Sequence, residues 1–223
     1  LIMTNKGILD KYIGDAIMAV FGAPFTTEMD ADNAVRTAVQ MVRSLTELNE
    51  QRIAGGKEPI RIGIGLNTDQ VLSGNIGSDR RMDYTVIGDG VNLAARLESA
   101  NKTYGTLILI SEFTVARLTS DFKLREVDRL VVKGKEEAVS MYEALDAYPD
   151  GVFPHMDAVL ASYNEGLKLY RAKDFVGAQQ SFEKAVNIHP GDGLSKLYVD
   201  RCVHFQALPP PDDWDGVWVM KTK

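Results

Sequence analysis

Cysteine and long apolar runs are the scarcest features of this sequence, and each absence excludes a class of protein. Cys202 is the single cysteine among 223 residues, so neither an intrachain disulfide nor a cysteine-based zinc site can form. A reducing compartment is the simplest interpretation of that count. The chain contains no apolar stretch of the roughly 18 residues that a membrane-spanning helix needs. Its first residues also lack the pattern of a cleavable signal peptide.

Positive charge is in the minority as well. Lysine and arginine number 25 against 31 aspartates and glutamates, which gives a net charge of −6. Sequence-independent nucleic-acid binding requires neutralisation of phosphates, so we expect no nucleic-acid partner. With 45% hydrophobic and 25% charged residues the composition is that of a globular protein, which excludes a disordered tail or a fibre. The length allows one or two domains and a sizeable core.

Strand and helix patterns alternate over the first two thirds of the chain, which indicates a layered α/β or α+β fold. Gly63 and Gly65 fall at every second position of one predicted strand. Such spacing indicates the close approach of another backbone or of a ligand, or simply a weak strand crossed by a helix. The predicted strands are 8–13, 16–21, 61–66, 82–87, 107–110, 124–132 and 139–145, and the predicted helices are 30–53, 90–103 and 113–118.

Strand patterns stop at Pro154, and three helical runs follow at 157–172, 175–188 and 194–208. Their small and aromatic positions have the spacing of one tetratricopeptide repeat. An isolated repeat does not bury its own faces, and about three are normally needed. We therefore predict a helical hairpin with a capping helix, docked on the first domain and available for a protein contact. The residues at the repeat positions are the small residues Gly166, Ala178 and Ala185, the aromatic residue Phe182, and Pro190.

Four local patterns occur in one order along the chain: DKYIGDA at 10–16, GNIGS at 74–78, DYTVIGDGVNLAARLE at 83–98, and VKGK at 132–135 followed by MYE at 141–143. Together they resemble the catalytic domain of class III nucleotidyl cyclases, most closely that of bacterial adenylate cyclases. The resemblance implies an α+β fold, with a mixed, mainly antiparallel sheet flanked by helices around a ferredoxin-like core. A small α-helical hairpin follows, so the predicted domains are 1–147 and 148–223.

Two residues stand at the places that read the purine in this family. Lys11 supplies a donor that suits the bare N1 acceptor of adenine, and the hydroxyl oxygen of Thr85 can accept from the N6 amino group. Guanine presents the reverse pattern, which guanylate cyclases typically meet with Glu and Cys. The resemblance therefore implies ATP as the substrate.

The remaining site residues are assigned by the same resemblance. Asp15 follows a glycine at the predicted hairpin tip, where an exposed carboxylate suits Mg²⁺ or Mn²⁺, and it matches one of the family's two metal-binding aspartates. Asn92 and Arg96 lie four residues apart on one helix face and match the pair that orients the ribose and stabilises the α-phosphate. Lys133 matches the lysine that binds the triphosphate, with Lys135 as the alternative.

The resemblance implies an adenylate cyclase that converts ATP to 3′,5′-cyclic AMP and pyrophosphate with two metal ions per site. In this family the sites lie at a head-to-tail homodimer interface, and the product serves intracellular signalling. The catalytic part is then cytoplasmic, with room for sensor or membrane segments upstream in the parent protein.

One departure concerns the family's first metal aspartate, which lies on a strand upstream of Leu1. Without that strand we expect this fragment to bind nucleotide poorly or to be inactive. Three alternatives stay open: a guanylate or mixed-specificity cyclase, a non-catalytic homologue that binds nucleotide or only dimerises, and a helical-repeat adaptor.

Overall fold

The computed structural model describes residues 1–78, 81–131 and 138–218. The chain forms two compact units: Leu1–Glu126 with Met141–Ala147, and Val127–Ser140 with Tyr148–Lys223. The predicted division between residues 147 and 148 stays a prediction. Within the described ranges, no helix has both the length and the apolar character to cross a membrane.

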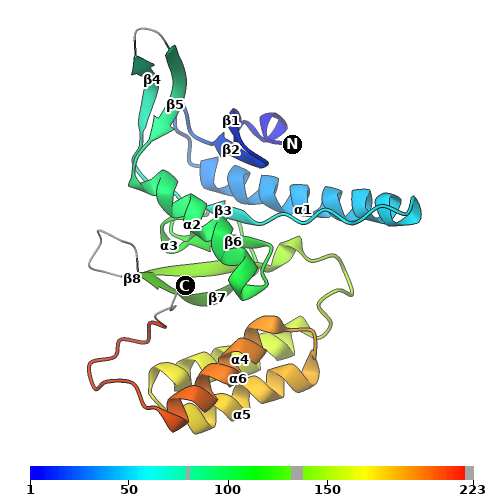
Figure 1. The fold of residues 1–223 in the computed structure, drawn as a ribbon, viewed down its shortest axis with the longest axis vertical. Helices are drawn as coiled ribbons and strands as arrows, with labels where there is room; N and C mark the ends of the chain where they lie inside the picture. Colours follow the sequence, from blue (N-terminus) through cyan, green and yellow to red (C-terminus); the bar gives the residue numbers. More distant parts are fainter. Residues whose placement is uncertain (79–80, 132–137, 219–223) are drawn as a thin grey trace. The chain divides into compact units, whose positions relative to one another are not determined.

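The helices and strands of both units are drawn in Figure 1. In chain order they are η1 (Met3–Asn5), β1 (Ile8–Ile13), β2 (Ala16–Val20), α1 (Asp30–Ala54), β3 (Ile64–Leu66), β4 (Leu72–Ser78), β5 (Arg81–Ile87), α2 (Asp89–Tyr104), β6 (Ile108–Ser111), α3 (Glu112–Val115), β7 (Leu124–Val131), β8 (Ala138–Ala144), η2 (Leu145–Ala147), α4 (Met156–Arg171), α5 (Phe175–Ile188) and α6 (Gly193–Ala207).

The predicted α+β class is confirmed, but the described strands divide among three sheets. Strands β1 and β2 form one antiparallel hairpin, and β4 and β5 form another. The third sheet has the order β3-β6-β8-β7, with β3 parallel and β8 antiparallel to β6. Strand β4 was not among the predicted strands, because its glycines obscure the alternation of apolar residues.

Helix α2 lies across strand β3 at a glycine (Figure 1). A Cβ atom added to Gly65 would stand 2.2 Å from the carbonyl oxygen of Ala94 and 2.3 Å from the backbone nitrogen of Glu98. No side chain fits in that space, so the glycine permits the helix to rest directly on the strand. Of the interpretations that the sequence left open, the close approach of another backbone and the crossing helix are both found, because the backbone that approaches belongs to α2.

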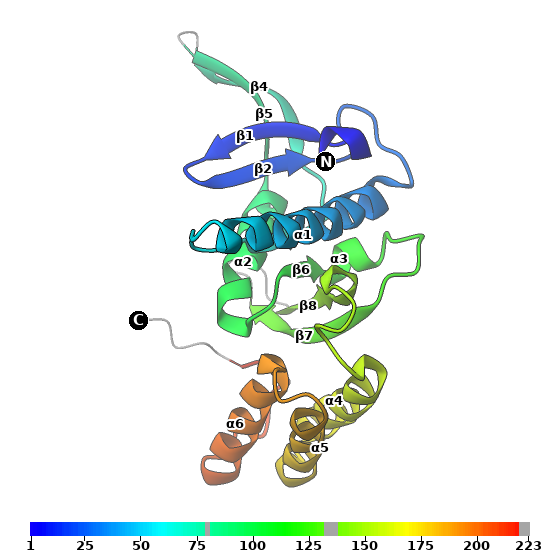
Figure 2. The same ribbon diagram turned by 90° about the vertical axis from the view of Figure 1, so that its right-hand side faces the viewer.

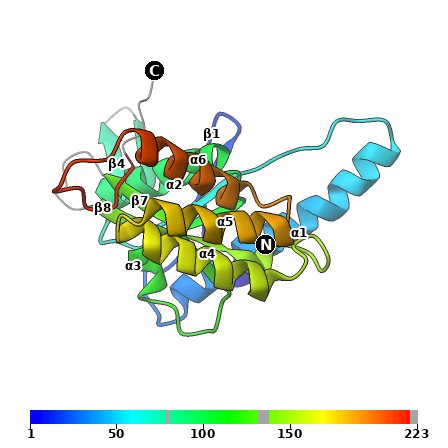
Figure 3. The same ribbon diagram turned by 90° about the horizontal axis from the view of Figure 1, so that it is seen from below.

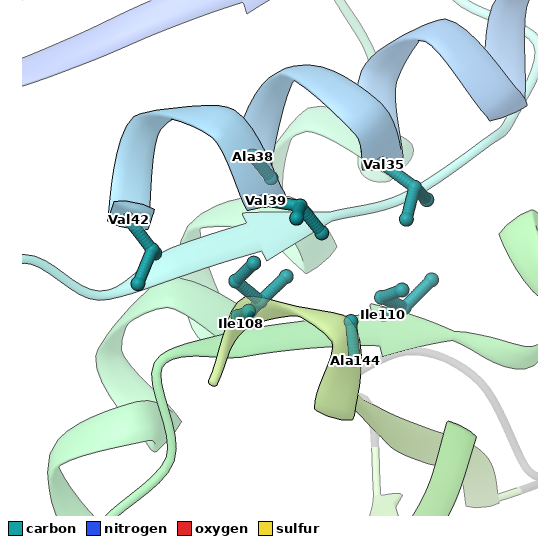
Figure 4. Close-up of a cluster of buried hydrophobic side chains, with 8 residues drawn as sticks. Val35, Ala38, Val39, Val42, Ile108, Ile110 and Ala144 are labelled. Atoms are coloured by element: carbon teal, nitrogen blue, oxygen red, sulfur yellow. The ribbon is translucent and has the colours of Figure 1, made fainter. Parts of the chain in front are cut away.

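The core of the first unit lies between α1 and the four-stranded sheet. Val35, Val39 and Val42 project from one face of the helix at intervals of three to four residues. They meet Ile108 and Ile110 of β6, as Figure 4 shows. This burial positions the long helix α1 on the sheet.

The second unit contains the three C-terminal helices, which pack side by side (Figure 3). Gly166 of α4 faces the ring of Phe182 on α5, and a Cβ at the glycine would come within 2.9 Å of that ring. The three predicted helices are confirmed, whereas their likeness to a tetratricopeptide repeat stays a prediction. Burial raises the pKa of the Cys202 thiol to about 12, so this cysteine is uncharged at neutral pH.

Helix α6 is bonded to the β7 residues that belong to the same unit. The Tyr198 hydroxyl donates to the carbonyl oxygen of Val127 over 2.8 Å. Arg201 pairs with Asp128 at 2.7 Å, and both side chains are only 3% exposed. The sequence pattern of α6 did not reveal this polar anchor inside a largely aromatic core.

A buried carboxylate at the start of α1 holds the segment after α3. Asp32 is fully buried and accepts hydrogen bonds from the backbone nitrogens of Thr119 and Ser120, each at 2.8 Å, and from both hydroxyls. Burial alone raises the pKa of this carboxyl. The four hydrogen bonds outweigh burial and lower the pKa below its ordinary value of 3.8.

The Asp32 network predicts an acid-sensitive contribution to stability. Because its folded-state pKa is lowered, the contribution is complete above the unfolded value and is lost as the pH falls through the folded value. We expect Asp32→Asn to lower the free energy of unfolding at pH 7 by about 1–3 kcal/mol. In denaturant unfolding between pH 2 and pH 7, the free energy of unfolding of Asp32→Asn should also fall less steeply toward acid pH than that of the wild type. The exposed Glu47→Gln variant on the same helix is the control, and an unchanged fall toward acid pH in Asp32→Asn would contradict the assignment.

The Arg201–Asp128 pair predicts a larger effect in the second unit. Asp128→Ala removes the buried charge that balances Arg201, and we expect a loss of about 3–5 kcal/mol. Combining Asp128→Leu with Arg201→Met should recover most of that loss, because no uncompensated charge remains. Thermal and denaturant unfolding measure both effects, and Asp200→Ala at an exposed position of α6 is the control. If Asp128→Ala is as stable as Asp200→Ala, the Arg201–Asp128 pair does not contribute to stability.

Candidate functional site

The tip of the β1–β2 hairpin carries the predicted metal ligand. Gly14 adopts a φ of 64°, in the left-handed region, and makes the two-residue turn with Asp15. Asp15 is exposed, and no hydrogen bond or ion pair of its carboxylate occurs within residues 1–78, 81–131 and 138–218. The described chain holds no cluster of three or more potential metal ligands. A hard cation at this tip therefore needs further oxygen ligands, beyond the Asp15 carboxylate, to complete its coordination.

The two predicted base readers meet at a third residue, Asp10. The Thr85 hydroxyl donates to Oδ2 of Asp10 over 2.9 Å, and the Lys11 ammonium lies 3.6 Å from the same oxygen. This contact joins the β1–β2 hairpin to strand β5, which runs past it in Figure 2. Sequence reasoning missed Asp10, although it stands first in the motif that contains Lys11.

Asn92 and Arg96 lie on the outer face of α2, while Leu93 and Leu97 face the core. Both polar side chains are exposed, and within the described ranges neither makes a hydrogen bond or an ion pair. Their spacing of four residues puts them on one helix face. An amide and a guanidinium side by side are suited to binding a hydroxyl and a phosphate.

Asn67, also missed as a functional residue, anchors the start of α2. Its side-chain amide nitrogen donates to the backbone carbonyl oxygen of Gly90 over 3.0 Å. Its side-chain oxygen Oδ1 accepts a hydrogen bond from the Ser111 hydroxyl at 2.6 Å. The first turn of α2 is thereby tied to the end of β6. Because Asn92 follows two residues after Gly90, Asn67 helps to position it.

The predicted residues are thus only partly brought together within one chain. Lys11 and Thr85 meet through Asp10, whereas Asp15, Asn92 and Arg96 share no hydrogen bond or ion pair with them in the described ranges. Lys133 and Lys135 lie outside the described residues.

A hollow of about 140 Å³ lies beside Asp10, between the two hairpins, and none of the predicted site residues lines it. Because Tyr84 and Val86 line it, it opens on the other face of β5 from Thr85. The lining residues are Ile8, Leu9, Asp10, Val20, Ala23, Ser73, Tyr84 and Val86.

Comparison with known proteins shows which proteins the chain is similar to. The terminal-differentiation-specific adenylate cyclase of Dictyostelium discoideum is 36% identical over 206 residues, which cover 91% of this chain but only 10% of that protein. The chain thus spans about a tenth of that relative, and the similarity continues past residue 144 into the C-terminal helices.

Two solved structures are similar to the chain. The adenylyl cyclase CyaB from P. aeruginosa is 36% identical with a TM-score of 0.58. The matched region covers 66% of this chain and 76% of the CyaB chain. The guanylyl cyclase Cya2 is 34% identical with the same TM-score of 0.58. The matched region covers 68% of this chain and 76% of the Cya2 chain. Residues 3–144 match the family model of the adenylate and guanylate cyclase catalytic domain. Since that match spans well over half of the 223 residues, the chain belongs to this family of cyclase catalytic domains.

Proposed function

We propose that the protein containing this chain converts ATP to 3′,5′-cyclic AMP and pyrophosphate. The observation that carries the proposal is the meeting of Lys11 and Thr85 at Asp10. An ammonium donor beside a hydroxyl oxygen complements the N1 acceptor and the N6 donor of adenine. An adenylyl and a guanylyl cyclase match the fold equally well, so the base-reading side chains favour ATP where the fold does not.

The proposed reaction is an in-line displacement within one nucleotide. The ribose 3′-oxygen forms a bond to the α-phosphorus, the bond from that phosphorus to the bridging oxygen breaks, and pyrophosphate leaves. The 3′-hydroxyl proton passes to water or to the leaving group, since no described side chain is an evident general base. Asn92 orients the ribose, and the Arg96 guanidinium stabilises negative charge that develops on the α-phosphate.

A divalent metal ion fits the residues present at the hairpin tip. Cyclase domains of this family use divalent metals, and Asp15 presents an exposed carboxylate on a two-residue turn. We propose that Asp15 and the triphosphate oxygens hold Mg²⁺ or Mn²⁺. When bound, two such ions neutralise the leaving pyrophosphate and lower the pKa of the 3′-hydroxyl. Lys133, outside the described residues, is proposed to bind the triphosphate.

A twofold dimer accounts for the separation of the site residues. Both hairpins expose large apolar side chains: Tyr12 and Ile13 on β1 are 68% and 58% exposed, and Leu72 on β4 is 65% exposed. A second copy covering them would remove this apolar surface from water. We propose that Asp15 of one subunit then works with Lys11, Thr85, Asn92, Arg96 and Lys133 of the other, which gives two sites per dimer.

The location and partners of the whole protein are part of this proposal. Because ATP is the substrate, the catalytic part is placed in the cytoplasm, with sensor or membrane segments upstream and a protein contact through the C-terminal helices. A guanylate cyclase is the second candidate, since the matched family and Cya2 include that activity.

Arg96 provides the first test of catalysis. We expect Arg96→Ala to lower the rate of cyclic AMP formation from ATP with Mn²⁺ by roughly 10²–10³-fold, because charge on the α-phosphate loses its stabilising partner. The natural full-length chain and the 223 residues alone are assayed side by side. Lys102→Ala, an exposed cation at the other end of α2, is the matched control. Absence of cyclic AMP from dimeric full-length protein would refute the enzyme assignment.

A mixing experiment tests whether the site is shared between subunits. Asp15→Asn and Arg96→Ala should each abolish most activity as homodimers. In a heterodimer one site receives both substitutions and the other receives none. We expect the equimolar mixture, after subunit exchange, to recover about a quarter of the wild-type activity. Sedimentation confirms that the dimers form, and heterodimers that stay inactive would contradict a shared site.

A further inference from the structure

Asp10 stands at the centre of the base-reading pair without a role in the reaction proposed above. Its side chain is 5% exposed, while that of Lys11 is 37% exposed. Oδ2 of Asp10 lies within 2.9 Å of the Thr85 hydroxyl and 3.6 Å of the Lys11 ammonium. The two groups proposed to read the base thus both contact one buried carboxylate.

A β-bulge makes this arrangement possible. Consecutive side chains of a regular strand point to opposite faces, so Asp10 and Lys11 should diverge. The register of β1 against β2 instead shifts here: Leu9 pairs with Ala19, and Lys11 pairs with Met18. Asp10 is therefore the extra residue of a bulge, which redirects its side chain toward Thr85. Because bulges recur beside active sites, this local irregularity is a candidate functional device.

The carboxylate determines which way the Thr85 hydroxyl points. An ionised carboxylate only accepts hydrogen bonds, so the hydroxyl proton of Thr85 is directed at Asp10. The lone pairs of Oγ1 remain for an incoming group, and they suit the N6 amino group of adenine. Guanine carries its O6 acceptor at that position, and two acceptors would then face each other. The Lys11 ammonium likewise suits adenine N1 and opposes the N1–H of guanine.

We propose that Asp10 is a positioning residue for base selection, one that orients the Thr85 hydroxyl and the Lys11 ammonium so that adenine is accepted and guanine is rejected. This inference rests on the proposed function, because it assumes that Lys11 and Thr85 read the base. Asp10 itself does not touch the nucleotide; it acts through its two neighbours.

A purely structural role for Asp10 makes a different prediction. The Asp10–Thr85 bond also ties the β1–β2 hairpin to β5. If that were its only role, removing the carboxylate would lower the melting temperature and weaken both nucleotides equally. Base selectivity therefore separates the two roles.

The test substitutes Asp10→Asn in the full-length protein. The Asn amide can donate to Thr85 Oγ1, which frees the hydroxyl proton to donate to guanine O6. We expect the ratio of kcat/KM for ATP to that for GTP to fall roughly tenfold or more, through a higher KM for ATP and a lower KM for GTP. Asp10→Glu should restore part of the selectivity, and Asp121→Asn, at an exposed position, is the matched control.

A double-mutant cycle locates the effect. Thr85→Val removes the hydroxyl with little change of volume, so Asp10→Asn should alter selectivity much less in that background. Equilibrium displacement of a fluorescent ATP analogue by ATP and by GTP gives a second readout that needs no turnover. Thermal melting of each variant shows whether it folds.

The outcomes separate the two proposals. If wild-type protein binds ATP selectively but forms no cyclic AMP, the proposed function fails, whereas a selectivity lost in Asp10→Asn still supports the role of Asp10. Unchanged selectivity in folded Asp10→Asn overturns that role, as does an equal weakening of both nucleotides. Protein that binds neither nucleotide overturns both proposals.

Discussion

The close contact between α2 and the glycine of β3 is the constraint on which the candidate site depends. Gly65 meets the backbone of α2 at Ala94 and Glu98, which flank the position of Arg96. Any side chain at Gly65 would lift the helix and displace its outer face. Asn67, two residues further along the chain, ties the helix start to β6. These contacts set the depth and the register of the helix that presents Asn92 and Arg96.

Buried carboxylates recur as anchors in this acidic chain, and each has a donor. Asp32 holds the segment after α3, Asp128 pairs with Arg201, and Glu143 pairs with Arg125 at 2.6 Å. A buried charge without such a partner is costly, so each anchor specifies one arrangement of its neighbours. Asp10 has the same character, but its two donors are the residues proposed to read the base. The carboxylates that stabilise the fold and the carboxylate that we propose to control base selection therefore have the same chemistry.

The comparisons separate what the fold decides from what the side chains decide. An adenylyl and a guanylyl cyclase match the chain with the same TM-score of 0.58, so the backbone does not choose the base. We propose that the choice depends on a few donors and acceptors, because the orientation of one hydroxyl proton is enough to reverse a hydrogen bond. The C-terminal helices α4, α5 and α6 have a different relation to the family, since the family match ends at residue 144 while the similarity to the Dictyostelium relative continues further.

The sequence by itself determined the local features of this protein. Periodicity located α1 and the C-terminal helices, the Gly14-Asp15 turn defined the first hairpin, and the motifs named Lys11, Thr85, Asn92 and Arg96. Only the tertiary structure decided that α2 crosses β3, that the strands form three sheets, and that a bulge turns Asp10 toward Thr85. The reason is physical: turns and helix faces depend on neighbours in the chain, whereas Asp10 and Thr85 are 75 positions apart, lie in separate sheets, and meet only where the two hairpins contact each other.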